Sequence, residues 1–142
     1  MAKVIHLKDI TANTTYEPPC WIFFGINNET VEGAKAVMGL TRSSPDVKNQ
    51  RHYHNNCNTG QYRIKGPVRL LIGPGYDTAE QDFIPGDFNF IPRGELHSAV
   101  GCGESTELVF CYAGVGSLKE AGTVFVEPPK SKGPETERTQ TS

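Results

Sequence analysis

Long hydrophobic runs, closely paired cysteines and an excess of basic residues are all missing from this 142-residue chain. No stretch approaches the eighteen apolar residues of a membrane-spanning helix, which argues against an integral membrane protein. The formal net charge is −2, and no basic patch or DNA-binding motif points to nucleic acid. We therefore predict a partner that is a small molecule rather than nucleic acid or a membrane.

The four cysteines, Cys20, Cys57, Cys102 and Cys111, are irregularly spaced and form no C-x-x-C motif. A chain of this length can bury a core without disulfide bonds, so we expect reduced thiols in a cytoplasmic protein. The first six residues also lack the apolar run of a secretory signal, which fits the same expectation.

A sustained helical period is absent as well, because 15 Gly and 10 Pro punctuate the whole chain. Between the turn signals lie segments of strand-like composition, at residues 21–26, 34–42, 50–54, 61–65, 68–72, 82–84, 89–91, 96–100, 108–112 and 123–126. Many short strands with evenly spread turns predict one all-β domain over residues 1–126, built as a double sheet or barrel. Residues 127–142 contain no Ala, Val, Ile, Leu, Met, Phe, Trp, Tyr or Cys, so we expect a disordered tail there.

Three histidines stand out against this background. His52 and His54 are spaced i, i+2, and in a strand such side chains leave the same face. His97 from a neighbouring strand would complete a facial set of nitrogen ligands with open positions for water or substrate. His6 lies outside this set, and a zinc site built from His54 and Cys57 is the weaker alternative, because His54 already has a better partner.

Two segments resemble the two motifs of the cupin superfamily. The second motif, G-x5-P-x-G-x2-H-x3-N, is matched by Gly86, Pro92, Gly94 and His97, with Gly101 at the Asn position. The first motif, G-x5-H-x-H-x(3,4)-E-x6-G, is matched by His52, His54 and Gly66, with Asp46 at the opening glycine and Thr59 at the glutamate. The resemblance spans roughly residues 35–112. It implies a cupin-type jelly-roll β-barrel, a divalent transition metal held by His52, His54 and His97, and a homodimer.

The threonine at position 59 bears on the chemistry. A threonine hydroxyl is a poor ligand for a divalent ion, so a histidine-only set leaves the charge of the ion uncompensated and favours an anionic or chelating substrate. Three-histidine iron sites in cupins are associated with oxygenases of thiols, diketones and hydroxyketones. The leading hypothesis is therefore an Fe(II) dioxygenase of a small chelating organic acid, ketone or phenol. Zinc, nickel or manganese would instead suit a non-redox isomerase, lyase or cyclase; a site that has lost its metal, and a ligand-binding barrel without catalysis, are further alternatives.

Strand alternation from Thr59 places Gln61 and Arg63 on the same side of their strand. An unpaired buried guanidinium is costly, so Arg63 should meet an acidic partner or an anionic ligand. We predict that Arg63 holds a substrate carboxylate or enolate and that Gln61 donates to a substrate oxygen or to metal-bound water. The alternative is an Arg63 at the barrel mouth, solvated or in a salt bridge.

Two apolar stretches carry packing expectations. Phe88 and Phe90 share one strand face and are expected in the core or beside the pocket. The segment 21–26 is apolar without clear alternation, which predicts a strand covered on both faces.

Overall fold

The structure, a computed structural model, describes residues 1–73, 79–127 and 136–139. Within these residues the chain is built almost entirely of strands, joined by one 3-10 turn and one short helix. The elements are η1 (Leu7–Asp9), β1 (Trp21–Ile26), β2 (Ala36–Ser43), β3 (His52–His54), β4 (Thr59–Lys65), β5 (Val68–Ile72), β6 (Ala79–Phe83), β7 (Phe88–Ile91), β8 (His97–Gly101), β9 (Thr106–Ala113), α1 (Leu118–Ala121), β10 (Thr123–Glu127) and β11 (Thr136–Thr139).

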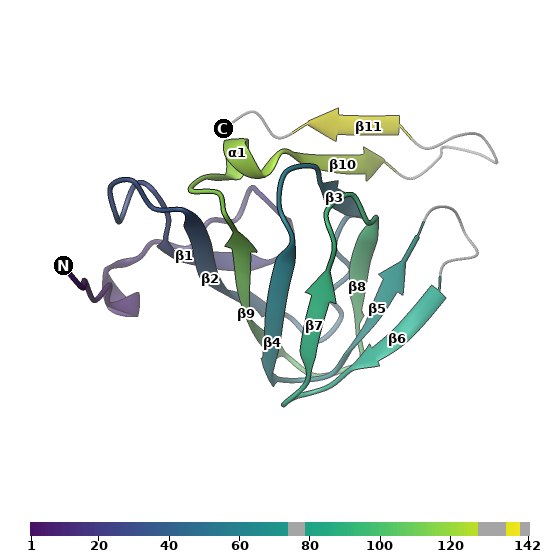
Figure 1. Cartoon of the computed structure of the whole chain (residues 1–142). Coiled ribbons are helices and arrows are strands. Elements are labelled where there is room, and N and C mark those ends of the chain that lie inside the picture. Colours follow the sequence, from purple (N-terminus) through teal and green to yellow (C-terminus); the bar gives the residue numbers. More distant parts are fainter. Residues whose placement is uncertain (74–78, 128–135, 140–142) are drawn as a thin grey trace.

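The strands form two sheets that face each other (Figure 1). One sheet has the order β1-β2-β9-β4-β7 and the other the order β11-β10-β3-β8-β5-β6. Neighbouring strands pair antiparallel, as between β2 and β9 and between β5 and β8. This is the all-β, double-sheet jelly-roll predicted from the sequence, and each predicted strand segment overlaps one of β1 to β10.

Alternation along the strands explains which faces meet. In β5, Val68 and Leu70 are buried while Arg69 between them is exposed, and β2 alternates in the same way. Side chains of one parity point between the sheets and those of the other parity point outward. The buried core includes Tyr16, Ile22, Val37, Phe110 and Phe125.

Two packing expectations are wrong within the single chain. β1 is an edge strand, in which Ile22 is fully buried but Trp21 remains 46% exposed, so only one face is covered. Phe88 and Phe90 are 83% and 65% exposed, because β7 turns both rings to the outer face of its sheet. Apolar character alone does not tell which parity faces the interior; the register of β7 against β4 decides it.

Asp46 and Gly101, which depart from the first position of the first cupin motif and the last position of the second, lie in segments that pack together. A Cβ atom at Gly101 would lie 2.5 Å from the Pro45 carbonyl oxygen and 3.0 Å from the Val47 nitrogen. The Gly101 N–H instead donates to the Val47 carbonyl at 2.7 Å. The turn that carries Asp46 therefore packs directly on β8, and a side chain at position 101 would prevent it.

The segment expected as a tail, residues 127–142, lies mostly outside the described residues. Glu127 is the last residue of β10, and Thr136–Thr139 pair with β10 as the antiparallel strand β11. A backbone ladder of this kind needs no apolar side chains, which is why composition did not indicate it. In the part of the chain that the structure describes, no helix has the length and apolar character needed to cross a membrane.

Candidate metal centre

Three histidines from two adjacent strands converge between the sheets. His52 and His54 leave the same face of β3, and His97, the first residue of β8, is the registered partner of His52. One nitrogen from each ring lies within 4.8 Å of the corresponding nitrogens of the other two. All three side chains are buried, with exposures of 2%, 3% and 5%. The i, i+2 spacing and the strand pairing together produce this cluster.

One nitrogen of each ring is already held by the protein. His52 Nδ1 lies 2.8 Å from the Gln50 carbonyl oxygen, and His97 Nδ1 lies 2.9 Å from the Glu95 carbonyl oxygen. A carbonyl only accepts, so Nδ1 carries the proton in both rings and Nε2 presents a lone pair. This is the arrangement that orients a histidine for metal binding.

His54 is held by a hydroxyl chain instead. Its Nδ1 lies 2.8 Å from Thr123 Oγ1, which lies 2.6 Å from the Tyr16 hydroxyl. The Tyr16 hydroxyl in turn lies 3.2 Å from that of Tyr112. These groups are buried and fix the ring of His54 from the side of β10.

The buried setting keeps the imidazoles neutral. Burial lowers the pKa of His52 to about 4, and burial together with the neighbouring His52 lowers the pKa of His97 to about 3. Burial and the two neighbouring imidazoles lower the pKa of His54 well below its ordinary value. Neutral imidazole is the metal-binding form, so the cluster has the right protonation state at neutral pH.

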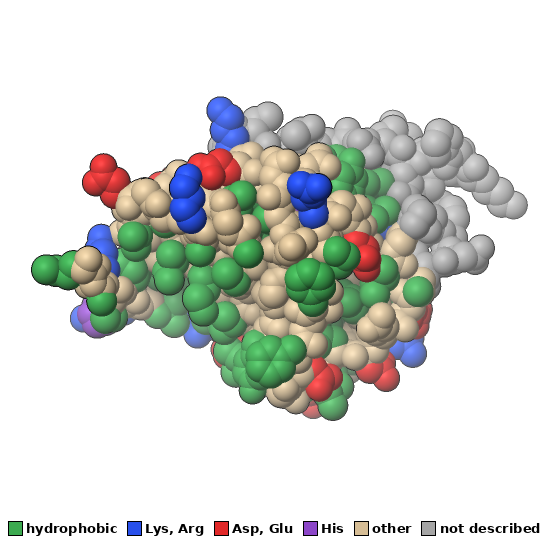
Figure 2. All heavy atoms as spheres, in the orientation of Figure 1, with side chains coloured by type: hydrophobic (Ala, Val, Ile, Leu, Met, Phe, Trp, Pro, Cys, Tyr) green, Lys and Arg blue, Asp and Glu red, His purple; other side chains and the backbone are tan. Residues whose placement is uncertain are grey.

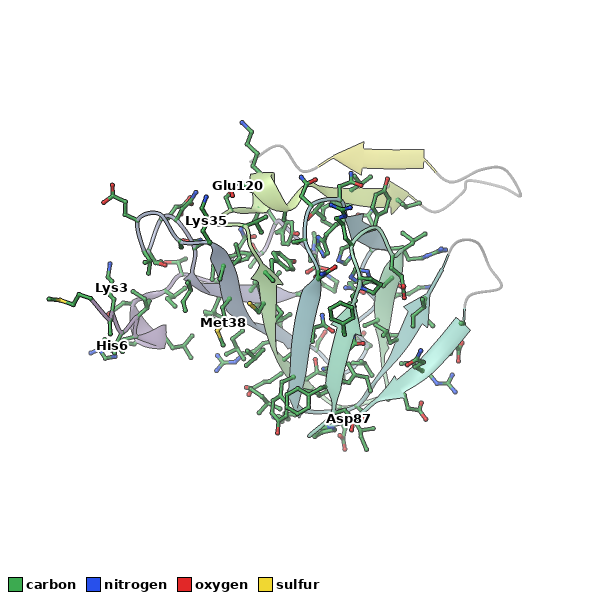
Figure 3. All side chains as sticks on the ribbon, in the orientation of Figure 1. Lys3, His6, Lys35, Met38, Asp87 and Glu120 are labelled. Carbon is green, nitrogen blue, oxygen red and sulfur yellow. The ribbon has the colours of Figure 1, made fainter. Side chains whose placement is uncertain are left out.

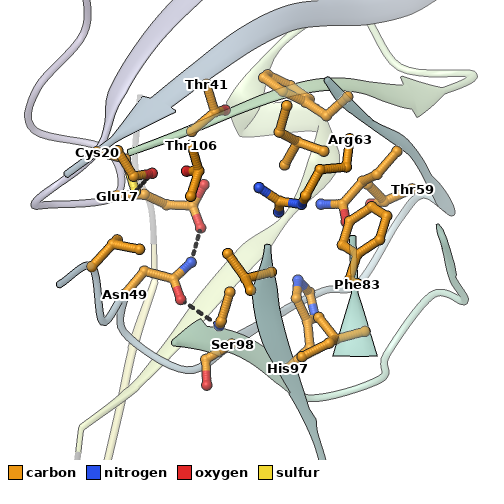
Figure 4. A pocket seen from close by; sticks show the side chains of 18 of the residues that line it. Glu17, Cys20, Thr41, Asn49, Thr59, Arg63, Phe83, His97, Ser98 and Thr106 are labelled. Atoms are coloured by element: carbon orange, nitrogen blue, oxygen red, sulfur yellow. Dashed lines mark hydrogen bonds between the residues drawn. The ribbon is translucent and has the colours of Figure 1, made fainter. Parts of the chain in front are cut away.

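Glu17 is a member of the site that the sequence analysis missed. Its Oε1 lies 3.0 Å from His52 Nε2 and accepts a hydrogen bond from Asn49 Nδ2 at 3.2 Å (Figure 4). Burial raises the pKa of this carboxyl and lowers that of His52, so both shifts favour a neutral pair. Glu17 precedes β1 and lies outside both motifs, and no spacing rule in the sequence connects it to the histidines.

Thr59 lies where the motif would supply a carboxylate. It is 1% exposed at the start of β4, and its hydroxyl oxygen has no hydrogen-bond partner among the described residues. Thr59 lines the same cavity as the histidines. Threonine therefore fills the position without acting as a strong metal ligand.

The structure also places Gln61 and Arg63 in the lining of this cavity. Arg63 is 3% exposed, its guanidinium lies 4.6 Å from the centre of the Phe83 ring, and burial lowers its pKa to about 10. Gln61 Oε1 accepts a hydrogen bond from Asn89 Nδ2 at 2.8 Å. Arg63 forms no ion pair within the described residues, and its Nε has no hydrogen-bond partner there. The acidic partner allowed for Arg63 is absent from that part of the chain.

The remaining candidates lie elsewhere. His6 is exposed on the N-terminal arm (Figure 3), and Cys57, although buried, is not part of the histidine cluster. The cavity itself measures about 60 Å³, which is room for a few waters or a small ligand.

These residues fit a divalent transition metal. Three neutral nitrogen donors converge, their outer nitrogens are fixed by hydrogen bonds, and the carboxyl group of Glu17 lies next to them. A histidine-rich set of this kind suits iron, zinc, nickel or copper.

No protein-family model and no curated protein matches this chain. Solved structures do match it. The polyketide cyclase RemF from Streptomyces resistomycificus superposes with a TM-score of 0.65 at 24% identity, over 80% of each chain. Oxalate decarboxylase from Bacillus subtilis has a TM-score of 0.70 at 19% identity, over 87% of this chain and 32% of that one. KdgF from Halomonas sp. has a TM-score of 0.63 at 12% identity, over 79% and 94%.

These structures are cupins, and the chain has the cupin fold. The described residues form one small barrel of this kind, with a three-histidine cluster in the interior.

Proposed function

We propose that this chain is a metal-dependent cupin enzyme, and that it is an Fe(II) dioxygenase of a small chelating organic acid, ketone or phenol. The observation that supports the proposal most is the convergence of three buried, neutral imidazoles in a cavity that is also lined by Arg63, a buried guanidinium without an ion pair among the described residues. His52, His54 and His97 would hold the ion. When bound, iron would supply the redox chemistry with dioxygen on a substrate that chelates it.

The residues of the chain position the substrate. Arg63 is buried in the cavity lining and forms no ion pair with the described residues, so it would bind a carboxylate or enolate oxygen of the substrate. The oxygen of Gln61 is engaged by Asn89, which leaves the Gln61 amide N–H groups to donate to a second substrate oxygen. The cavity of about 60 Å³ restricts the substrate, or the part of it that reacts, to a small group.

Oxygen consumption tests this proposal. The metal-free protein is loaded anaerobically with Fe(II) and mixed with aerated buffer and a panel of diketones, hydroxyketones and catechols. We expect substrate-dependent oxygen uptake with at least one of these, its loss in His97→Ala, and its retention in the matched control His6→Ala. An absence of uptake across the panel, together with turnover supported by zinc or nickel, would contradict the dioxygenase proposal.

A non-redox lyase, isomerase or cyclase is the second candidate. The likeness in fold to a polyketide cyclase and to an oxalate decarboxylase favours it. The same three histidines would then hold zinc, nickel or manganese as a Lewis acid. Stoichiometric recovery of a redox-inert ion, with no oxygen uptake, supports this candidate. A protein that binds small acids equally well with and without metal would instead be a ligand-binding cupin.

We further infer that the protein works in the cytoplasm. All four cysteines are free, including the exposed Cys102, and a reducing compartment keeps thiols in that state. Cell fractionation with an antibody to the chain tests this inference, and recovery from an oxidising compartment would contradict it.

A further inference from the structure

The three histidines provide no negative charge, although they surround a buried point where a dication would sit. Thr59 occupies the position from which a cupin of the usual pattern would provide a carboxylate, and its hydroxyl is buried without a partner among the described residues. A dication held only by neutral groups in a buried site keeps its full charge. A carboxylate ligand would compensate part of this charge. The acidic residue among those that line the cavity is Glu17.

The distance between Glu17 and His52 suits two ligands of one ion. Oε1 of Glu17 and Nε2 of His52 are 3.0 Å apart. Two donor atoms that each lie about 2.1 Å from a metal ion, at right angles to one another, are separated by about 3.0 Å. Nε2 is also the nitrogen of His52 that is not bonded to the Gln50 carbonyl, and it presents its lone pair toward Glu17.

Glu17 lies in a segment that backbone hydrogen bonds hold against β1. Asn13 and Ile22 exchange backbone hydrogen bonds of 2.7 and 2.9 Å across it, so the residues between them form a closed loop against β1. Tyr16, next to Glu17, is 1% exposed and bonds to Thr123, which holds His54. The loop is thereby tied to the histidine cluster.

Asn49 fixes the carboxylate from the other side. Its Nδ2 donates to Glu17 Oε1 at 3.2 Å, while its Oδ1 accepts from the Ala99 N–H of β8 at 2.7 Å. Figure 4 shows Glu17 and Asn49 facing each other in the cavity that also holds His97 and Arg63. The carboxylate is therefore oriented in advance and enters the site from the side of His52.

We propose that Glu17 is the fourth protein ligand of the metal, so that the segment before β1 supplies the carboxylate that Thr59 cannot. The inference rests on the proposed metal site. It gives the chain a three-histidine, one-carboxylate set assembled from β3, β8 and a loop outside the two motifs. One anionic ligand then compensates half of the charge of the dication, and the remaining open positions are left for a chelating substrate.

Metal affinity and Co(II) spectra test this assignment. Zn(II) affinity is measured by competition with a chromophoric chelator, and Co(II) absorption spectra are recorded, for the full chain and for Glu17→Gln, Glu29→Gln and the double variant Glu17→Gln/Thr59→Glu. Glu29 is an exposed acid and serves as the matched control. We expect Glu17→Gln to lose roughly 10- to 100-fold or more in Zn(II) affinity and to change the Co(II) ligand-field bands. Glu29→Gln should match the parent, and the double variant should recover most of the lost affinity.

The other outcomes are distinguishable. A Zn(II) affinity of Glu17→Gln within twofold of the parent would overturn the assignment. A weaker affinity with an unchanged Co(II) spectrum would also overturn it, because Glu17 would then act only by orienting His52 and not as a ligand. A parent chain that binds neither ion would instead refute the metal site itself. Circular dichroism of the metal-free variants shows whether Glu17→Gln is folded, and recovery in the double variant provides the same assurance.

Discussion

At the scale of single residues, the cavity lining contains two buried polar groups that lack a partner in the described part of the chain, the Arg63 guanidinium and the Thr59 hydroxyl. Arg63 is buried against Phe83 without an ion pair in the described part of the chain, and Thr59, which lines the same cavity, has a hydroxyl without a hydrogen-bond partner there. Both features cost stability in the protein without ligand. Their arrangement is readily explained if an anionic ligand completes the interior.

Arg63→Met tests this explanation. Replacing a buried, unpaired cation by an apolar side chain of similar length is expected to stabilise the metal-free fold, by about 1–2 kcal/mol, while weakening the binding of carboxylate ligands. Thermal denaturation and titration with small acids measure the two effects. Arg69→Met, at an exposed residue paired with Glu80, is the matched control and should change neither. A destabilised Arg63→Met with undiminished acid binding would contradict the assigned role.

The histidines predict how stability depends on pH. Their pKa values are lowered in the folded protein, to about 4 at His52 and about 3 at His97, so between those values and 6.5 the unfolded chain binds more protons than the folded one. Stability of the metal-free protein is therefore full above pH 6.5 and is lost as the pH falls toward 4. Glu17, with a raised pKa, acts in the opposite direction but is one group against three. We expect Tm to fall by roughly 5 °C or more between pH 7 and pH 4.5.

A Tm that stays level or rises over this range would contradict the buried, neutral state of the cluster. Replacing His6, which is exposed, should leave the profile unchanged, whereas His97→Ala should flatten part of it.

At the scale of elements, the site depends on β10, which pairs with β3, the strand that carries His52 and His54. Phe125 of β10 is the registered partner of His52, is fully buried, and lies with its ring centre 5.4 Å from that of His52. A cavity at this point would loosen both β3 and the ring that it positions.

Phe125→Ala is therefore expected to destabilise the protein by about 3–5 kcal/mol. Phe88→Ala removes the same side chain from an 83% exposed position and is expected to change stability by no more than about 0.5 kcal/mol. Urea denaturation of both variants measures the two changes. Equal changes would contradict the buried position of Phe125 or the exposed position of Phe88.

The elements also show what the sequence could and could not predict. The predicted bounds of β1 and β5 agree with the structure, because apolar, β-branched or aromatic residues fill them and turn residues flank them. β6 begins earlier than predicted, since its polar residues are exposed and it is held to β5 by backbone pairing. His52, His54 and His97 could be grouped from motif spacing, whereas Glu17 could not, because a loop closed by Asn13 and Ile22 brings it there. Local patterns predict the strands, but not always which face of a strand is buried, and not which loop folds back over the cavity.

At the scale of the whole molecule, the outer face of the five-stranded sheet carries a run of exposed apolar side chains. Figure 2 shows hydrophobic side chains spread over this face, and they include Met38, Tyr62, Ile64, Phe88 and Phe90. Tyr62 and Phe88 are cross-strand partners with ring centres 4.9 Å apart. An exposed apolar surface of this extent is typical of a protein interface.

We propose that a second copy of the chain covers this face, giving a homodimer. A twofold interface brings the same surface of two copies together, so each copy would bury the apolar face of the other. Sedimentation equilibrium should give twice the 15.6 kDa of the chain, and Phe88→Glu with Phe90→Glu should reduce it to the single-chain mass without loss of fold. A monomeric parent, or a dimer that persists in the double variant, would contradict this proposal.

The central claim for the whole molecule is that His52, His54 and His97 hold one metal ion between the sheets. Elemental analysis of protein reconstituted with Fe(II) or Zn(II) and then desalted measures it most directly, in the parent, in His97→Ala and in His6→Ala. The account predicts one ion per chain in the parent and in His6→Ala, and almost none in a folded His97→Ala. A parent without bound metal, or a His97→Ala variant that keeps its full complement, would contradict it.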